Sequence, residues 1–265
     1  MQRGKSIASK AAKSVKSKPD FPTTQVDELH NAFAKAGDPN KAAYMKKYMR
    51  NIAEFHGLQT PERIDVETQV FQAFEDDLKS MDRETFNKIA DLCFAKPHRE
   101  THHSCLAVIK KYYAKKLTSD DLPKLEELVI KGGWWDITDS LFTCIGQIIV
   151  KDRDLQLKKN KEYLEHEDRW IRRVAIMHQH SFKDKTDEEL LFGNIVKTCH
   201  EEEWFIRKAI GWALREYSKT SPKAVVQFIE NHNDKLSKLS KVEGLKYLKN
   251  NKEKFKGIKL PKIDE

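Results

Sequence analysis

The sequence of 265 residues lacks a long uninterrupted hydrophobic run. Its most apolar stretch, residues 140–150, is interrupted by Thr143, Gly146 and Gln147. That stretch is shorter than the roughly 18 apolar residues that a membrane-spanning helix requires. We therefore predict a soluble protein that has no membrane partner.

Cysteine is scarce, and no two cysteines form a CxxC pair. This spacing argues against a zinc-thiolate or redox site and predicts reduced, buried thiols. Together with the lack of a signal-peptide pattern, it predicts an intracellular location. That location would be the nucleus in a eukaryote and the cytoplasm or nucleoid in a bacterium. The four cysteines are Cys93, Cys105, Cys144 and Cys199.

The sequence also lacks a glycine-rich phosphate loop and a Ser-His-Asp set in register. His98, His102 and His103 place two imidazoles one helical turn apart, a spacing that resembles a metal site. We interpret them as solvated or DNA-facing histidines. No metal and no cofactor are predicted.

The net charge of +8 is concentrated at the two ends of the chain. Residues 1–20 contain six basic and one acidic side chain, and residues 235–265 contain ten basic and four acidic ones. The remaining residues, 21–234, therefore carry about −3. Such a middle region can bind nucleic acid only if folding gathers its basic side chains on one face. A solvated surface of mixed charge is the alternative.

Apolar residues recur every three to four positions from residue 27 onward, and none alternate in twos over the length of a strand. This pattern predicts an all-α protein of about a dozen short helices packed as antiparallel hairpins. Thr60 and Ser221 each precede a proline and are expected N-caps. We predict a monomer with a disordered basic arm, a single repeat domain and a short tail, at residues 1–20, 21–255 and 256–265 respectively.

An internal repeat is visible in the second half of the chain. Residues 166–176 align with residues 200–210 at an offset of 34 without a gap. A further step of 34 places Asp139 where the later copies have Arg173 and Arg207. This period suits tetratricopeptide or HEAT-like pairs, and the tetratricopeptide pattern is missing. We therefore predict an α-α superhelix (solenoid) of HEAT-like repeats, which would bind its ligand on the concave surface.

All five tryptophans lie within these repeats. Trp170 and Trp204 recur at one repeat position beside apolar residues, so we expect both to fill the core between helices. Trp134, Trp135 and Trp212 do not recur. These three are the better functional candidates.

Trp135 and Asp139 are four residues apart, a spacing that places an indole and a carboxylate on one face of a helix. Asp136 is a competing carboxylate, but it is also a candidate N-terminal cap. Asp139 lies deeper in the helix, where capping does not explain it. The arginines at its repeat position, Arg173 and Arg207, can either meet a phosphate or pair with acidic residues between repeats. Spacing alone leaves both options open.

Three segments of the chain resemble signature segments of the AlkD-like DNA alkylation-repair family, in the same order and at matching separations. Weaker similarity extends the resemblance over roughly residues 27–250, with little family pattern between residues 94 and 103. The three segments are residues 133–139, 170–176 and 208–217.

The resemblance implies a role for several side chains. It places an aromatic pair beside the lesion at Trp135 and Trp212, with Asp139 as the catalytic carboxylate. It also implies that Arg173 contacts DNA and that Tyr48 lies on the lesion side. Arg207, at the repeat position of Arg173, is expected to bind DNA as well.

The function implied is that of a monofunctional DNA glycosylase acting on double-stranded DNA that carries cationic N3- or N7-alkylated purines. Indole faces attract such a cation, and a carboxylate stabilises the positive charge that develops on the sugar. No lysine nucleophile is required, so no lyase step is predicted. The alternatives are a non-catalytic relative that binds DNA and a HEAT-type scaffold that binds proteins.

Overall fold

The structure is a computed structural model that describes residues 20–263. This part of the chain forms 14 α-helices and no β-strand, apart from one isolated bridge between Glu54 and His98. The predicted all-α class is therefore confirmed. No helix within residues 20–263 has both the length and the apolar character needed to cross a membrane. The predicted arm at residues 1–20 lies almost wholly outside the described residues.

The chain divides into two compact units, one ending at Ser104 and the other beginning at Cys105. In the first unit, α1 packs against α3 and α5, with Leu29, Phe33 and Phe86 fully buried. Helix α2 differs, because none of its residues is buried. The helices of this unit are α1 (Thr23–Ala36), α2 (Pro39–Tyr48), α3 (Thr60–Ala73), α4 (Glu75–Ser80), α5 (Arg83–Ala95) and the beginning of α6 (Arg99–Val108).

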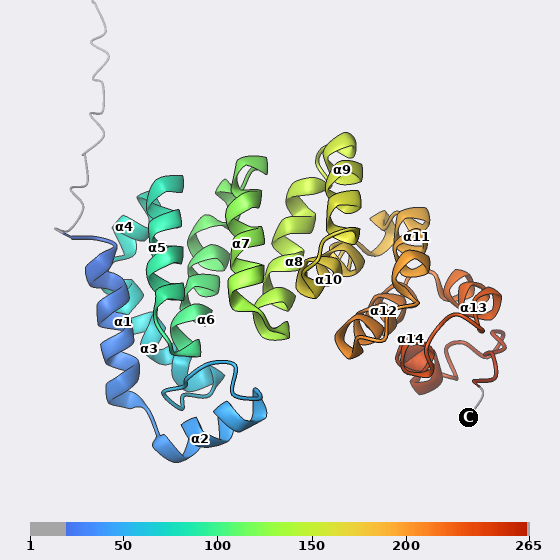
Figure 1. Ribbon diagram of the computed structural model, residues 1–265, viewed down its shortest axis with the longest axis horizontal. Helices are drawn as coiled ribbons and strands as arrows, with labels where there is room; N and C mark the ends of the chain where they lie inside the picture. Colours follow the sequence, from blue (N-terminus) through green and yellow to red (C-terminus); the bar gives the residue numbers. More distant parts are fainter. Residues whose placement is uncertain (1–19, 264–265) are drawn as a thin grey trace, which may run out of the picture. The chain divides into compact units, whose positions relative to one another are not determined.

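The second unit is a two-layer stack of helices (Figure 1). Consecutive helices from α7 to α11 contact one another, as do α12, α13 and α14. In addition, α8 contacts α10, α10 contacts α12 and α12 contacts α14, so these four helices form one row. The helices are α7 (Leu122–Gly132), α8 (Trp135–Ile149), α9 (Arg153–Leu164), α10 (Arg169–Met177), α11 (Glu188–Thr198), α12 (Trp204–Tyr217), α13 (Pro222–Asn231) and α14 (Lys238–Asn250).

Residues 34 apart are direct neighbours in this stack. The amides of Asn160 in α9 and Asn194 in α11 exchange two hydrogen bonds of 2.8 and 2.7 Å. In the other layer, Arg169 of α10 donates to Glu203, the residue before α12, at 3.2 Å. The sequence offset therefore connects equivalent positions of adjoining helical pairs.

Two glycines determine how α8 is placed. Gly133 ends α7 in the left-handed region at φ 52°, where a side chain would be strained, and this turn leads into α8. Further along α8, a Cβ on Gly146 would lie 2.0 Å from the carbonyl oxygen of His178. Only a glycine lets α8 approach the end of α10 this closely.

The helix boundaries largely follow local signals. Helix α13 begins at Pro222 after Ser221, as predicted. The predicted N-cap at Thr60 is wrong by one residue, because Gln59 is the N-cap and forms a capping box with Glu62. All four cysteines are free, and three of them are buried, namely Cys93, Cys105 and Cys199, whereas Cys144 is half-buried.

Candidate active site

The row of helices α8, α10 and α12 carries most of the predicted site residues. Trp135 is the first residue of α8, and Asp139 follows one turn later. Arg173 belongs to α10 and Trp212 to α12. Because α8 contacts α10 and α10 contacts α12, the site is built from three successive helices of one layer.

A bidentate ion pair joins the first two of these helices. Arg173 donates from Nε to Oδ1 of Asp139 at 2.8 Å and from Nη2 to Oδ2 at 3.0 Å. Its remaining terminal nitrogen, Nη1, donates to the carbonyl oxygen of Phe205 in α12 at 2.7 Å. The side chain of Arg173 is 3% exposed and that of Asp139 is 17% exposed. Of the two arrangements left open for this arginine, the structure shows pairing between repeats.

Burial and charge act in opposite directions on Asp139. Burial raises the pKa of its carboxyl group, and the positive charge and hydrogen bonds of Arg173 counteract this effect. The charge of Asp136, three residues earlier in α8, adds a smaller upward shift in the pKa of Asp139. The carboxylate is thus partly desolvated and fixed in direction, which strengthens its interaction with any positive charge that develops nearby.

Aromatic side chains adjoin the ion pair. The ring of Trp212 lies 5.8 Å from the guanidinium carbon of Arg173 and makes edge contacts with Phe142 and His180, at centroid distances of 6.0 and 4.6 Å. Trp212 is half-buried, as is Trp135 on the Asp139 helix. Both indoles therefore keep part of their surface available for a ligand.

Comparison with known proteins identifies the family. The family model described as DNA alkylation repair enzyme matches residues 29–248. The chain belongs to the DNA alkylation repair enzyme family. A solved structure, described as a predicted DNA alkylation repair enzyme from Enterococcus faecalis, is 28% identical with a TM-score of 0.72. The similarity covers 80% of this chain and 96% of that one. No curated protein matches.

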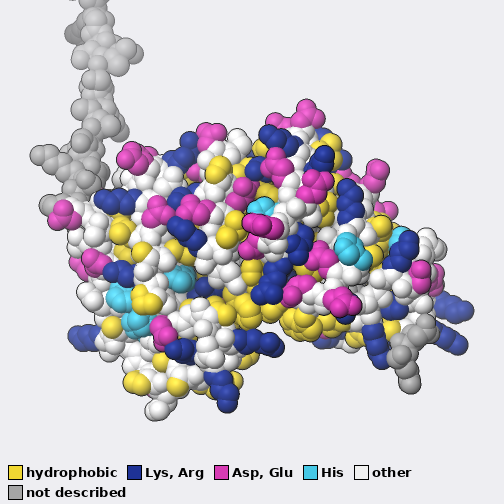
Figure 2. All heavy atoms as spheres, viewed as in Figure 1, with side chains coloured by type: hydrophobic (Ala, Val, Ile, Leu, Met, Phe, Trp, Pro, Cys, Tyr) yellow, Lys and Arg dark blue, Asp and Glu magenta, His cyan; other side chains and the backbone are white. Residues whose placement is uncertain are grey.

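Membership of the DNA alkylation repair enzyme family confirms the resemblance seen in the three sequence segments. It supports a role in DNA repair and a DNA substrate. On the face drawn in Figure 2, basic and acidic side chains are interspersed over most of the surface. The face drawn in Figure 2 is therefore not uniformly basic.

His180 was not singled out from the sequence, yet it lies beside Trp212. Burial lowers the pKa of His180, although Glu216, whose carboxylate is 3.8 Å from Nε2, acts in the opposite direction. The repeat offset instead pairs Trp212 with His178, a buried residue whose Nδ1 bonds the carbonyl of Ala175 at 2.9 Å. The repeat spacing therefore gives no signal for His180.

The prediction that Trp204 fills the core is wrong, whereas that for Trp170 is confirmed. Trp170 is 3% exposed, and its ring packs against Trp134 and Phe205 at 5.7 and 4.9 Å. Trp204 is 53% exposed, because the neighbouring Phe205 occupies this aromatic core. Trp134, a functional candidate in the sequence, is buried in the same core.

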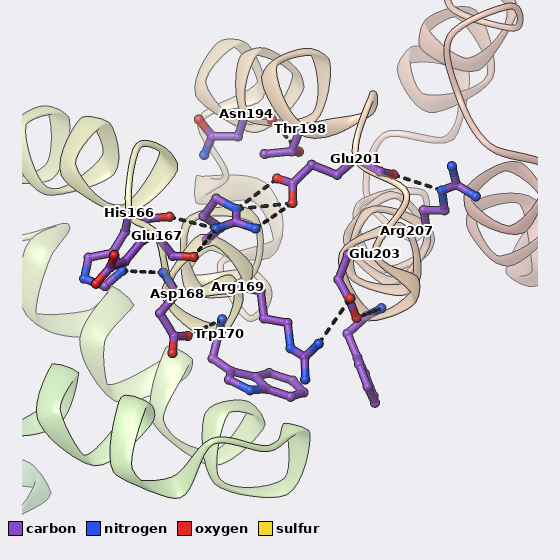
Figure 3. A network of polar contacts seen from close by, with 12 residues as sticks. His166, Glu167, Asp168, Arg169, Trp170, Asn194, Thr198, Glu201, Glu203 and Arg207 are labelled. Carbon is purple, nitrogen blue, oxygen red and sulfur yellow. Dashed lines mark hydrogen bonds and ion pairs between the residues drawn. The ribbon is translucent and has the colours of Figure 1, made fainter.

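Arg207 lies in a network that joins the starts of α10 and α12 (Figure 3). It donates from Nε to the carbonyl oxygen of Glu201 at 2.9 Å. The Glu201 carboxylate accepts two-pronged bonds from Arg172, at 3.0 Å from Nε and 2.8 Å from Nη2. Arg207 is half-buried and lies in α12. Both arginines therefore donate to a backbone carbonyl, but Arg173 also pairs with the carboxylate of Asp139.

Tyr48 belongs to the first unit, at the end of α2. Its side chain is exposed, as is that of Tyr44 one turn earlier. The helix has no buried face. Two ion pairs connect it to the segments that follow, Lys41 with Glu62 and Lys46 with Glu54, both at 2.5 Å. Tyr44 was not considered in the sequence; its spacing of four from Tyr48 places both rings on one face of the helix.

Of the three histidines considered together in the sequence, His98 alone belongs to the histidine cluster found among the described residues. His102 stacks on Phe94 at 4.7 Å and donates from Nε2 to the carbonyl oxygen of Lys96 at 2.8 Å. His98 lies instead beside His30 and His56. A histidine cluster therefore exists, but its members differ from those that sequence spacing grouped.

Proposed function

We propose that this protein is a monofunctional DNA glycosylase that removes cationic N3- or N7-alkylated purines from double-stranded DNA. The observation that carries the proposal is the Asp139 carboxylate, which Arg173 holds by two hydrogen bonds next to the half-buried ring of Trp212. Family membership supports the choice of an alkylated DNA substrate.

The chemistry requires little from the protein. An alkylated purine already carries positive charge, and cleavage of its glycosidic bond releases it as a neutral base. Positive charge then moves to the sugar, which becomes similar to an oxocarbenium ion. A carboxylate stabilises that charge or orients the attacking water, and a rigid one does so without reorganising. In this proposal Asp139 has that role, and Arg173 is a positioning residue that holds the carboxylate.

The indoles of Trp135 and Trp212 supply the attraction for the cationic nucleotide. A cation over an indole face gains about 0.5–2 kcal/mol, and more when water is excluded. Contact through the sugar leaves the lesion within the duplex, so no pocket has to enclose the base. Bulky adducts are then acceptable substrates. Tyr48 is a separate proposed DNA contact. Water is the nucleophile, and strand cleavage by a lyase step does not follow.

A base-release experiment tests the proposal. Duplex DNA containing N7-methylguanine or N3-methyladenine is incubated with excess protein, and free base is measured by chromatography against the uncatalysed rate. We expect release of the free base without an added nucleotide, and abasic DNA that stays uncleaved until it is treated with alkali. Duplex binding without base release would favour the non-catalytic relative, and failure to bind duplex at low salt would favour the protein scaffold.

A further inference from the structure

We infer that His30, His56 and His98 form a binding site for a divalent transition-metal ion, with Zn²⁺ as the ion that suits them. One ligand atom from each imidazole can be chosen so that all three lie within 4.8 Å of one another. The residues come from α1, from the loop after α2 and from the position before α6, all within the first unit. Imidazole nitrogen is a preferred ligand of zinc.

One of the three nitrogen separations is already close to that in a coordinated ion. A tetrahedral zinc with bonds of about 2.0–2.1 Å places its ligand nitrogens about 3.4 Å apart. Nε2 of His56 and Nδ1 of His30 are already 3.5 Å apart. The His98 ring stacks on His56 at a centroid distance of 3.7 Å, with planes 8° apart. One ligand nitrogen of His98 lies within 4.8 Å of a nitrogen from each of the other two rings, so binding one ion requires the three to move closer together.

One nitrogen of the cluster has no other use within the described residues. Nδ1 of His98 is buried without a hydrogen-bond partner, which is costly unless something binds it. The nearby cation Lys96 is paired with Asp27 at 2.7 Å, which reduces its repulsion of a bound ion.

The backbone that presents these rings is fixed in advance. The buried carboxylate of Glu100 accepts hydrogen bonds from the backbone N–H groups of His56, Gly57 and Leu58, at 2.9–3.2 Å. The bridge from Glu54 to residues 97–99 joins the His56 loop to the segment that carries His98. An ion placed here would cross-link α1, this loop and the start of α6, and would stabilise the first unit.

Metal binding is measured on the full chain after it has been stripped with a chelator and dialysed. Titration with Zn²⁺ in a calorimeter should show one equivalent bound per chain, with a rise in the thermal midpoint that depends on ion concentration. Co²⁺ should give the visible absorption of a nitrogen-ligated ion. Substituting one of the three histidines should weaken the affinity for Zn²⁺ by more than the roughly 10- to 100-fold typical of changing a residue that only hydrogen-bonds to a metal ligand.

Three variants decide the assignment. His56→Ala and the milder His30→Gln should both lose the ion, whereas His200→Ala, which removes an exposed histidine from the second unit, should bind it like the unaltered chain. His30→Gln keeps the test open if His56→Ala does not fold. The assignment is overturned if the unaltered chain binds no ion, or if both ligand variants bind it as tightly as His200→Ala. Base release at Asp139 is measured separately, so neither proposal depends on the other.

Discussion

Helices α10 and α12 carry two copies of the same sequence motif, yet equivalent side chains have different surroundings. Trp170 is buried at the start of α10, whereas Trp204 at the start of α12 is half exposed to solvent. Arg173 is enclosed in an ion pair, whereas Arg207, 34 residues later, donates to a backbone carbonyl. A repeat therefore reproduces the backbone position without reproducing the environment of the side chain.

The difference originates in the preceding helix of the row. Arg173 follows a helix that offers Asp139 at the equivalent position, so a carboxylate meets it. Arg207 follows a helix that offers Arg173 itself, which cannot accept a hydrogen bond. The residue 34 positions earlier thus decides whether each arginine finds a carboxylate partner. A single aspartate at the first of these positions converts a repeated arginine into part of a candidate active site.

The largest expected effect concerns the two tryptophans and the free energy of unfolding. Trp170→Ala should lower it by about 3–5 kcal/mol, because it empties the space between Trp134 and Phe205. Trp204→Ala should lower it by about 1 kcal/mol, since it removes one edge contact with Phe205 from an exposed position. Urea unfolding followed by circular dichroism measures both. Equal losses would show that the two copies of the motif have equivalent cores after all.

The next largest effect concerns the carboxylate of Asp139 and the rate of base release. Asp139→Asn should slow base release by about 10²–10³-fold while duplex affinity changes little, because the carboxylate acts on charge that develops only as the bond breaks. Single-turnover rates and equilibrium binding on one labelled duplex provide the two measurements. Removing the charge also leaves Arg173 buried without a counter-ion, so rates are compared well below the melting temperature of the variant.

The pH profile provides an independent check on the same carboxylate. Burial raises the pKa of Asp139, so the ionised and active form is lost as pH falls through a value above that of an ordinary aspartate. Enzymatic release, corrected for acid-catalysed loss of the base, should therefore show an acid limb in the unaltered protein and none in Asp139→Asn. An acid limb that persists in the variant would assign it to another group.

Local periodicity predicted the helices, their 34-residue offset and the shared face of Trp135 and Asp139, because these depend on residues close in sequence. It could not decide between phosphate and aspartate for Arg173, since spacing fixes a backbone position but not the direction of a long side chain. It placed Trp204 in the core, where the structure has Phe205. Adjacent aromatic residues both suit a core position, and only packing selects one. The cluster of His30, His56 and His98 follows no period, so only the tertiary fold brings it together.

The smallest expected effect is a change in the salt dependence of binding, which tests whether Arg173 or Arg207 contacts DNA. Arg207→Ala should make the plot of log affinity against log salt shallower by about 0.9, as expected for the loss of one phosphate contact. The matched control replaces the buried pair together, as Arg173→Met with Asp139→Asn, and should leave the slope unchanged because that pair carries no net charge. If the control lowers the slope and Arg207→Ala does not, then Arg173 leaves Asp139 to bind a phosphate. The ion pair would in that case be a resting state that DNA opens.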